Sequence, residues 1–202
     1  MKGYWVIGIA MVAGMHAQAS DCDLNVYVLT GVPMPAGMLL DATKRATAMF
    51  REIGVKVIMR EGVPGRESKD GCGGPIVIQI EDSNGYNGPS AALAYAMPYR
   101  QAGTCIHIFL DRVRLLDSVE MSRDPRLANS VLAHVMAHEI THQLEQSDRH
   151  SKEGVMKSRW SRHDYDGMAR QSLPFAPEDV ELIHKGLRRR SVHSMTNATG
   201  TA

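Results

Sequence analysis

The sequence is short of several features, and each shortage argues against a class of function. Its 202 residues carry a formal net charge of +1, so nothing in the composition suggests a nucleic-acid partner. It has three cysteines, and no two of them stand at the spacing of a cysteine zinc knuckle. Internal repeats and low-complexity blocks are absent as well. The length then fits a single ordinary domain.

The N-terminal apolar run is too short for a membrane span and fits an export signal. Lys2 precedes the run from Tyr4 to Met15, and Ala17-Gln18-Ala19 offers small residues to a signal peptidase. A spanning helix needs about 20 apolar residues, so a membrane anchor is the weaker alternative. We expect a secreted or periplasmic protein with no membrane insertion after cleavage. Its parts would be a signal peptide (1–19), one catalytic domain (20–190) and a flexible tail (191–202).

In an exported protein, an odd number of cysteines indicates one disulfide and one spare thiol. Periodicity does not decide which two of Cys22, Cys72 and Cys105 pair. Cys22 stands just before the first expected strand, so a structural disulfide explains it better than an inhibitory thiol does.

Alternation and helical periodicity predict a mixed fold. Strands are expected at 24–29, 55–59, 75–80 and 104–110, with a weaker edge strand at 91–97. Helices are expected at 39–53, from Asp124-Pro125 to about Glu145, and at 180–190. This order favours an α+β fold of α/β character, in which helices back a mixed, mostly parallel sheet. His107 is interpreted as an ordinary strand histidine, and Arg188-Arg189-Arg190 as a solvated helix end.

The helix that ends near Glu145 carries an HExxH motif, His138-Glu139-Ile140-Thr141-His142. Residues four apart share a helix face, so both imidazoles can reach one cation. Glu139 can hold and deprotonate a zinc-bound water, and then pass the proton to the leaving amine of a peptide. The expected apolar stripe of this helix lies on another face and consists of Leu132, Met136, Ile140 and Leu144.

Two histidines leave a catalytic zinc ion one protein ligand short. Asp148 and His150 both follow the end of the helix, where the chain can turn back towards the metal. A neutral imidazole matches the other two ligands, which favours His150, with Asp148 as the alternative. A thermolysin-like arrangement would use Glu178 or Glu181 instead. His134, one turn before His138, is expected to line the cleft or to pack.

These residues resemble the metzincin clan of zinc peptidases: the HExxH motif, a third ligand at short range, and Gly154-Val155-Met156. The resemblance implies that Met156 forms a turn beneath the metal and that the edge strand at 91–97 lines the substrate cleft. The stretch from Ala94 to Arg190 is similar to small exported metzincin-like bacterial proteins. They share Asp111-Arg112-Val113, Ala137-His138-Glu139, His150-Ser151 and Trp160, and their late third histidine again implies His150.

Several positions depart from the metzincin pattern or from that of these relatives: Thr141, Glu145, Gln146, Asp148 and Ser158. Gln146 stands where the variant with the late histidine commonly has glycine, so no glycine ends the helix. Ser158 stands two residues after Met156, where some metzincins have a tyrosine that stabilises the transition state.

The sequence therefore predicts an exported, monomeric, zinc-dependent endopeptidase that acts on peptide or protein substrates. An alternative on the same fold is a zinc-binding module that recognises peptide or glycan without catalysis. Such a module has no need of Glu139. A structural zinc protein would differ in having a closed fourth coordination position.

Overall fold

The structure is a computed structural model that describes residues 22–65, 72–97, 104–118 and 126–199. Its centre is one sheet of five strands in the order β2-β1-β3-β5-β4. The strands are β1 (Leu24–Thr30), β2 (Val57–Glu61), β3 (Ile76–Glu81), β4 (Ala94–Ala96) and β5 (Thr104–Phe109). Four strands run parallel, and β4 pairs antiparallel with β5 at the edge. The predicted fold class is confirmed.

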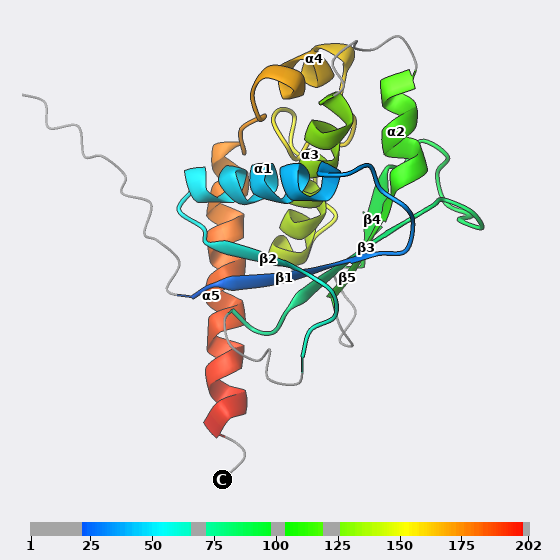
Figure 1. Cartoon of the computed structure of the whole chain (residues 1–202). Coiled ribbons are helices and arrows are strands. Elements are labelled where there is room, and N and C mark those ends of the chain that lie inside the picture. The colour runs from blue at the N-terminus through cyan, green and yellow to red at the C-terminus, as the bar shows by residue number, and fades with distance from the viewer. Residues whose placement is uncertain (1–21, 66–71, 98–103, 119–125, 200–202) are drawn as a thin grey trace, which may run out of the picture.

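One face of the sheet carries the core. Along β3, fully buried Ile76, Ile78 and Ile80 alternate with half-buried residues. Helices α1 (Met38–Glu52) and α3 (Leu127–Glu145) lie over this buried face (Figure 1). Because successive side chains of a strand point to opposite faces, every second residue of each strand projects away from these helices.

Helix α3 is buried on all sides rather than along one stripe. Every residue of it except Asn129 is buried. It contacts the other four helices as well as β3, β4 and β5. A helix that is buried on all sides exposes no polar face to solvent. The predicted apolar stripe lies in the core, and His138, Glu139 and His142 line a cavity, but the motif-bearing face is buried as well.

The ends of the helices also differ from the prediction. Helix α3 begins at Leu127 with Arg126 at the N-cap position, whereas the expected cap Asp124-Pro125 lies outside the described residues. Two helices were not predicted, α2 (Leu110–Ser118), which follows β5 directly, and α4 (Arg162–Arg170). Helix α5 (Pro177–Thr199) continues past the predicted end at Arg190.

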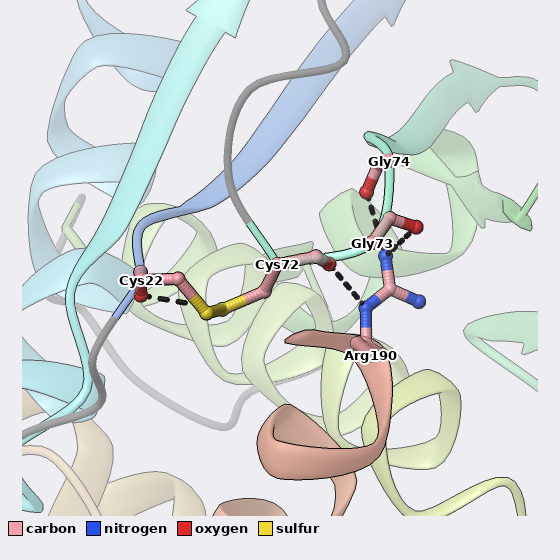
Figure 2. The surroundings of a disulfide bond; sticks show 5 residues. All are labelled: Cys22, Cys72, Gly73, Gly74 and Arg190. Carbon is pink, nitrogen blue, oxygen red and sulfur yellow. Dashed lines mark hydrogen bonds between the residues drawn. A yellow bond between two sulfur atoms is a disulfide. The ribbon is translucent and has the colours of Figure 1, made fainter. Parts of the chain in front are cut away.

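A disulfide joins Cys22 to Cys72, 50 residues apart, and Cys105 is free. Figure 2 shows the side chain of Arg190 reaching from α5 to the backbone beside this bond. Its Nε donates to the carbonyl of Cys72 at 2.8 Å, and its Nη2 to that of Gly74 at 2.6 Å. Arg189 donates to the carbonyls at the end of α3, those of Leu144 and Glu145. Arg190 is therefore not solvated as predicted, whereas Arg188 and Arg189 are exposed, and the helix does not end at these residues.

The predicted signal peptide lies outside the described residues. Within the described part of the chain, no helix has the length and apolarity needed to cross a membrane. The division into signal, domain and tail stays a prediction.

Candidate metal centre

His138 and His142 lie one turn apart on α3, and their Nε2 atoms are 3.0 Å apart. The Nδ1 atom of His138 donates to the carbonyl of Val155 at 2.9 Å. The Nδ1 atom of His142 donates to the carbonyl of Ser147 at 2.8 Å. A carbonyl oxygen only accepts, so each Nδ1 carries the hydrogen and each Nε2 presents a lone pair. Two lone pairs that face each other at this distance repel unless a cation lies between them.

The loop after α3 brings His150 to the same place. The ligand atoms of His138, His142 and His150 all lie within 4.8 Å of one another, and we call this group the three-histidine cluster. Asp148 lines the same cavity but is not part of the group. Glu178 pairs with Arg149, and Glu181 is exposed. The structure therefore brings together the three histidines that were predicted as ligands, and leaves the carboxylate alternatives outside.

The charge state of the cluster suits a metal ion. Burial lowers the pKa of His138 to about 3 and that of His142 to about 4. Burial also lowers the pKa of His150. All three imidazoles are therefore neutral at neutral pH, which is the form that binds metals. Three neutral nitrogen donors with one carboxylate beside them are the donor set of a catalytic zinc site.

Glu139 is 7 % exposed and lines a cavity of about 900 Å³ together with the three-histidine cluster. Burial raises the pKa of Glu139 to about 8. Its carboxyl group therefore holds a proton at neutral pH unless a nearby positive charge favours the ionised form. A cation at the three-histidine cluster would supply that charge.

The edge of the sheet forms one wall of this cavity, as the sequence predicted. Residues 89–96, which include β4, line it together with the histidines, and Leu115 and Leu116 of α2 line it as well. Arg112 fixes the segment before β4, because its Nη1 donates to the carbonyls of Pro89 at 3.0 Å and Ala92 at 2.7 Å. Pockets that bury drug-sized ligands have volumes in this range.

A buried aspartate, Asp179, binds the residues that precede and follow His150 in its loop. Asp179, in the first turn of α5, is fully buried. Its Oδ1 accepts hydrogen bonds from Arg149 and, at 2.5 Å, from the hydroxyl of Ser151. His150 lies between these two residues, so Asp179 anchors both of its neighbours. The sequence does not point to Asp179 as a site residue, because nothing local signals a contact 30 residues away.

The turn at Gly154-Val155-Met156 also adjoins the cluster, since Val155 accepts from His138. Gly154 has φ +74°, and a Cβ atom there would lie 2.2 Å from the carbonyl oxygen of Pro174. Met156 is fully buried, and its carbonyl accepts from the amide of Ser151 at 2.7 Å. The turn thus ties the two halves of the loop together. The position of Met156 beneath a metal stays a prediction.

His134 packs, which is one of the two roles expected for it. Its Nδ1 donates to the carbonyl of Ser130 at 2.6 Å, and its Nε2 accepts from the amide of Leu173 at 2.9 Å. Both nitrogens are used, so His134 offers no metal ligand. The ring of Trp160 lies edge-on to both His134 and His138, with centroids 6.3 and 5.7 Å apart.

A mostly parallel sheet, an antiparallel edge strand and a buried helix with two histidines, completed by a third from the next loop, define a zincin-type architecture. Among solved structures, the chain is similar to the archaemetzincin of Methanopyrus kandleri, with a TM-score of 0.55 and 16% identity. The match covers 83% of this chain and 97% of that one. No protein-family model and no curated protein matches the sequence. The predicted resemblance to the metzincin clan is confirmed at the level of the fold.

Proposed function

We propose that the protein is a zinc-dependent endopeptidase that is exported and acts as a monomer on peptide or protein substrates. The observation that carries this proposal is the three-histidine cluster beside Glu139 at the wall of a large cavity. The archaemetzincin-like fold supports the zinc peptidase class in general.

The residues of the site suit the hydrolysis of a peptide bond. Zinc held by the three histidines would supply a Lewis acid for the scissile carbonyl and lower the pKa of water. Glu139 takes the proton of the attacking water and then gives it to the leaving amine. The hydrogen bonds from the Nδ1 atoms of His138 and His142 hold both rings in the orientation that points Nε2 at one spot.

The edge strand supports a peptide substrate. Strand β4 is the last strand of the sheet, and among the described residues no other strand pairs with its outer edge. That edge can therefore pair with an extended chain. An extended peptide that adds to a sheet edge gains main-chain hydrogen bonds without a demand on its sequence. This arrangement suits an endopeptidase better than an enzyme for a small polar substrate.

The two alternatives fit less well. A binding module without catalysis would bury the Glu139 carboxyl at a cost in free energy and with no use for it. A structural zinc site is closed by four protein ligands, whereas this cluster has three histidines and faces a cavity of about 900 Å³.

The test combines zinc content with cleavage of an unstructured protein such as casein. Glu139→Gln should keep about one zinc ion per chain and lose cleavage by at least about 100-fold, because it removes the proton carrier alone. His150→Ala should lose zinc, and Asp148→Ala is the matched control that should keep both zinc and activity. Full cleavage by Glu139→Gln would contradict the mechanism. Loss of zinc from Asp148→Ala, with zinc kept by His150→Ala, would overturn the choice of ligand.

Export rests on the N-terminal sequence, with Lys2, the apolar run and Ala17-Gln18-Ala19 as support. We expect a secreting bacterial host to release a chain that starts at Ser20, as measured by intact mass. Ala19→Pro, next to the cleavage position, should leave the uncleaved precursor in the cells. Release of a chain that still begins at Met1 would contradict this part of the proposal.

A further inference from the structure

A second group of reactive side chains lies on the other face of the sheet. Cys105 and His107 of β5 alternate with Ile106 and Ile108, which are fully buried in the core. They therefore project from the face opposite α3, away from the three-histidine cluster. Glu81, at the end of the neighbouring strand β3, joins them. We call Glu81, Cys105 and His107 the thiol cluster.

The thiol cluster has the order of contacts that activates a nucleophile. The Sγ atom of Cys105 lies 3.5 Å from Nε2 of His107. The Nδ1 atom of His107 lies 2.9 Å from Oε1 of Glu81. An ionised carboxylate only accepts, so Nδ1 carries the hydrogen, and Nε2 is left to accept from the thiol. A nucleophile, a base and a group that orients the base form the arrangement found in nucleophilic catalysis.

Tyr95 of β4 holds the base in place. Its ring stacks on the imidazole of His107 with centroids 4.7 Å apart and planes at 3°. Tyr86 stacks in turn on Tyr95, with centroids 5.3 Å apart. The aromatic face also stabilises positive charge on His107 when it takes a proton. The reactive side chains and Tyr95 stand on strands, which fix such geometry better than loops do.

We propose that the thiol cluster reacts with small disulfides, and that Cys105 retains half of the disulfide as a mixed disulfide. In this step the S–H bond of Cys105 breaks, and its proton moves to Nε2 of His107. The Sγ atom bonds to one sulfur of the disulfide, the S–S bond breaks, and the leaving thiolate takes the proton from His107. One disulfide is consumed and one thiol is released, so no further oxidant is needed. Glu81 stabilises the imidazolium that forms between the two proton transfers.

The state of the cysteines favours this reactant. Cys22 and Cys72 are joined, whereas Cys105 is a free, half-buried thiol. A disulfide of this kind forms in oxidising compartments, where small disulfides are also present. Burial, followed by the charge of Glu81, raises the pKa of Cys105. The thiol therefore keeps its proton at neutral pH, and its reaction depends on the neighbouring base.

The experiment uses the full chain, unreduced, with bis(2-hydroxyethyl) disulfide as the probe, and follows the intact mass over time at pH 7.5. We expect one adduct per chain, mapped to Cys105 by peptide mass and absent from Cys105→Ser. The rate should fall at least about tenfold in His107→Gln, which removes the base, and by a smaller factor in Glu81→Gln. His163→Gln, a change at an exposed histidine of α4, is the matched control and should react at the wild-type rate.

Each rate is divided by that of the same variant in 8 M urea, where all thiols react alike. An unchanged ratio in His107→Gln would overturn the proposal, and so would an adduct at another residue. If His107→Gln unfolds the protein, Glu81→Gln decides, because its side chain is 29% exposed and its loss leaves the core intact. A wild-type ratio in Glu81→Gln would then reject the thiol cluster as a reactive site.

Discussion

At the scale of single residues, Gln146 sets the direction in which the chain leaves α3, the helix that carries His138 and His142. It has φ +53° and is the one residue other than glycine with positive φ in the part of the chain that the structure describes. The left-handed conformation costs an L-residue about 1 kcal/mol. We expect Gln146→Gly to raise the free energy of unfolding by about 0.5–1 kcal/mol, as measured by urea denaturation.

The same change at Gln171 is the control for Gln146→Gly. Gln171 ends α4 with φ −150°, an extended conformation that any residue adopts. Gln171→Gly should therefore give no gain in stability. An equal gain at both positions would show that the left-handed backbone is not the cause.

Asp179 is the second residue with a consequence for the site. It anchors Arg149 and Ser151 on either side of His150 and is fully buried. Asp179→Asn should lower zinc affinity by roughly 10–100-fold, measured by competition with a chelator, because His150 loses its fixed position. It should also lower the free energy of unfolding by about 1–3 kcal/mol, since the ion pairs that Arg149 keeps, with Glu145 and Glu178, are longer, both at 3.5 Å.

Glu178→Gln is the matched control for Asp179→Asn, because Glu178 is the acidic residue next to Asp179. Its side chain is 69% exposed and pairs with the same Arg149 at 3.5 Å. Glu178→Gln should change stability by less than about 1 kcal/mol and leave zinc affinity unaltered. Equal losses of zinc in the two variants would point to the net charge rather than to the anchor.

Whether a residue of the site could be predicted depends on how far its contact partners lie along the sequence. His138, Glu139 and His142 could be predicted because their spacing acts within one turn of a helix. His150 followed from the need for a third donor close behind them. The role of Asp179 and the contact of His134 with Leu173 could not be predicted, since their partners stand about 30 to 40 residues away in sequence. Periodicity carries no information about such contacts.

At the scale of elements, the same limit explains which helices were predicted. Helix α1 shows a clear periodicity because one of its faces meets the core. Helix α4 buries only Met168, so its apolar signal is weak. Helix α2 begins at the residue after β5, without a loop to mark the change. Helix α3 was found, but burial on all sides depends on neighbours that no local pattern reveals.

The contact between α3 and α5 depends on Gly186. A Cβ atom there would lie 2.0 Å from the carbonyl oxygen of Leu144, so the two helix backbones pass very close. Gly186→Ala should lower the free energy of unfolding by about 2–3 kcal/mol, because the helices have to move apart. Gly167→Ala in α4 is the control, since its nearest neighbour would be a leucine methyl group at 3.6 Å. It should stabilise the protein by up to about 1 kcal/mol.

The start of α2 gives the protein a pH-dependent contact. Asp111 accepts hydrogen bonds from the amide of Ser83 at 3.0 Å and from its hydroxyl at 2.6 Å. Burial acts to raise the pKa of Asp111, but the bonds from Ser83 and the charge of Arg112 outweigh it and lower the pKa. Stability from this carboxylate is thus fully present above its unfolded pKa of about 4, and is lost as pH falls through the lower folded pKa.

Asp111→Ala tests whether stability falls with decreasing pH because this carboxylate takes up a proton. We expect it to lower the free energy of unfolding by about 1–2 kcal/mol at pH 7, with a difference from wild type that shrinks as pH falls below about 4. Denaturant unfolding at a series of pH values measures this difference. A difference that stays constant down to pH 2 would assign the loss to packing instead of charge.

At the scale of the whole molecule, one disulfide and one arginine join the start of the described chain and α5 to the segment before β3. Cys22 precedes β1, Cys72 precedes β3, and Arg190 of α5 binds the carbonyls beside Cys72 (Figure 2). The bond closes a loop of 50 residues, and a loop of that length is worth about 4 kcal/mol in chain entropy.

Since that entropy belongs to the unfolded chain, the double change Cys22→Ser, Cys72→Ser should lower the free energy of unfolding by about 2–4 kcal/mol. Zinc content of the folded protein should stay unchanged, because the three-histidine cluster contacts neither cysteine. Cys105→Ser, which breaks no bond, should unfold at nearly the wild-type urea concentration, and an equal loss in both would show that the cysteines stabilise by packing alone.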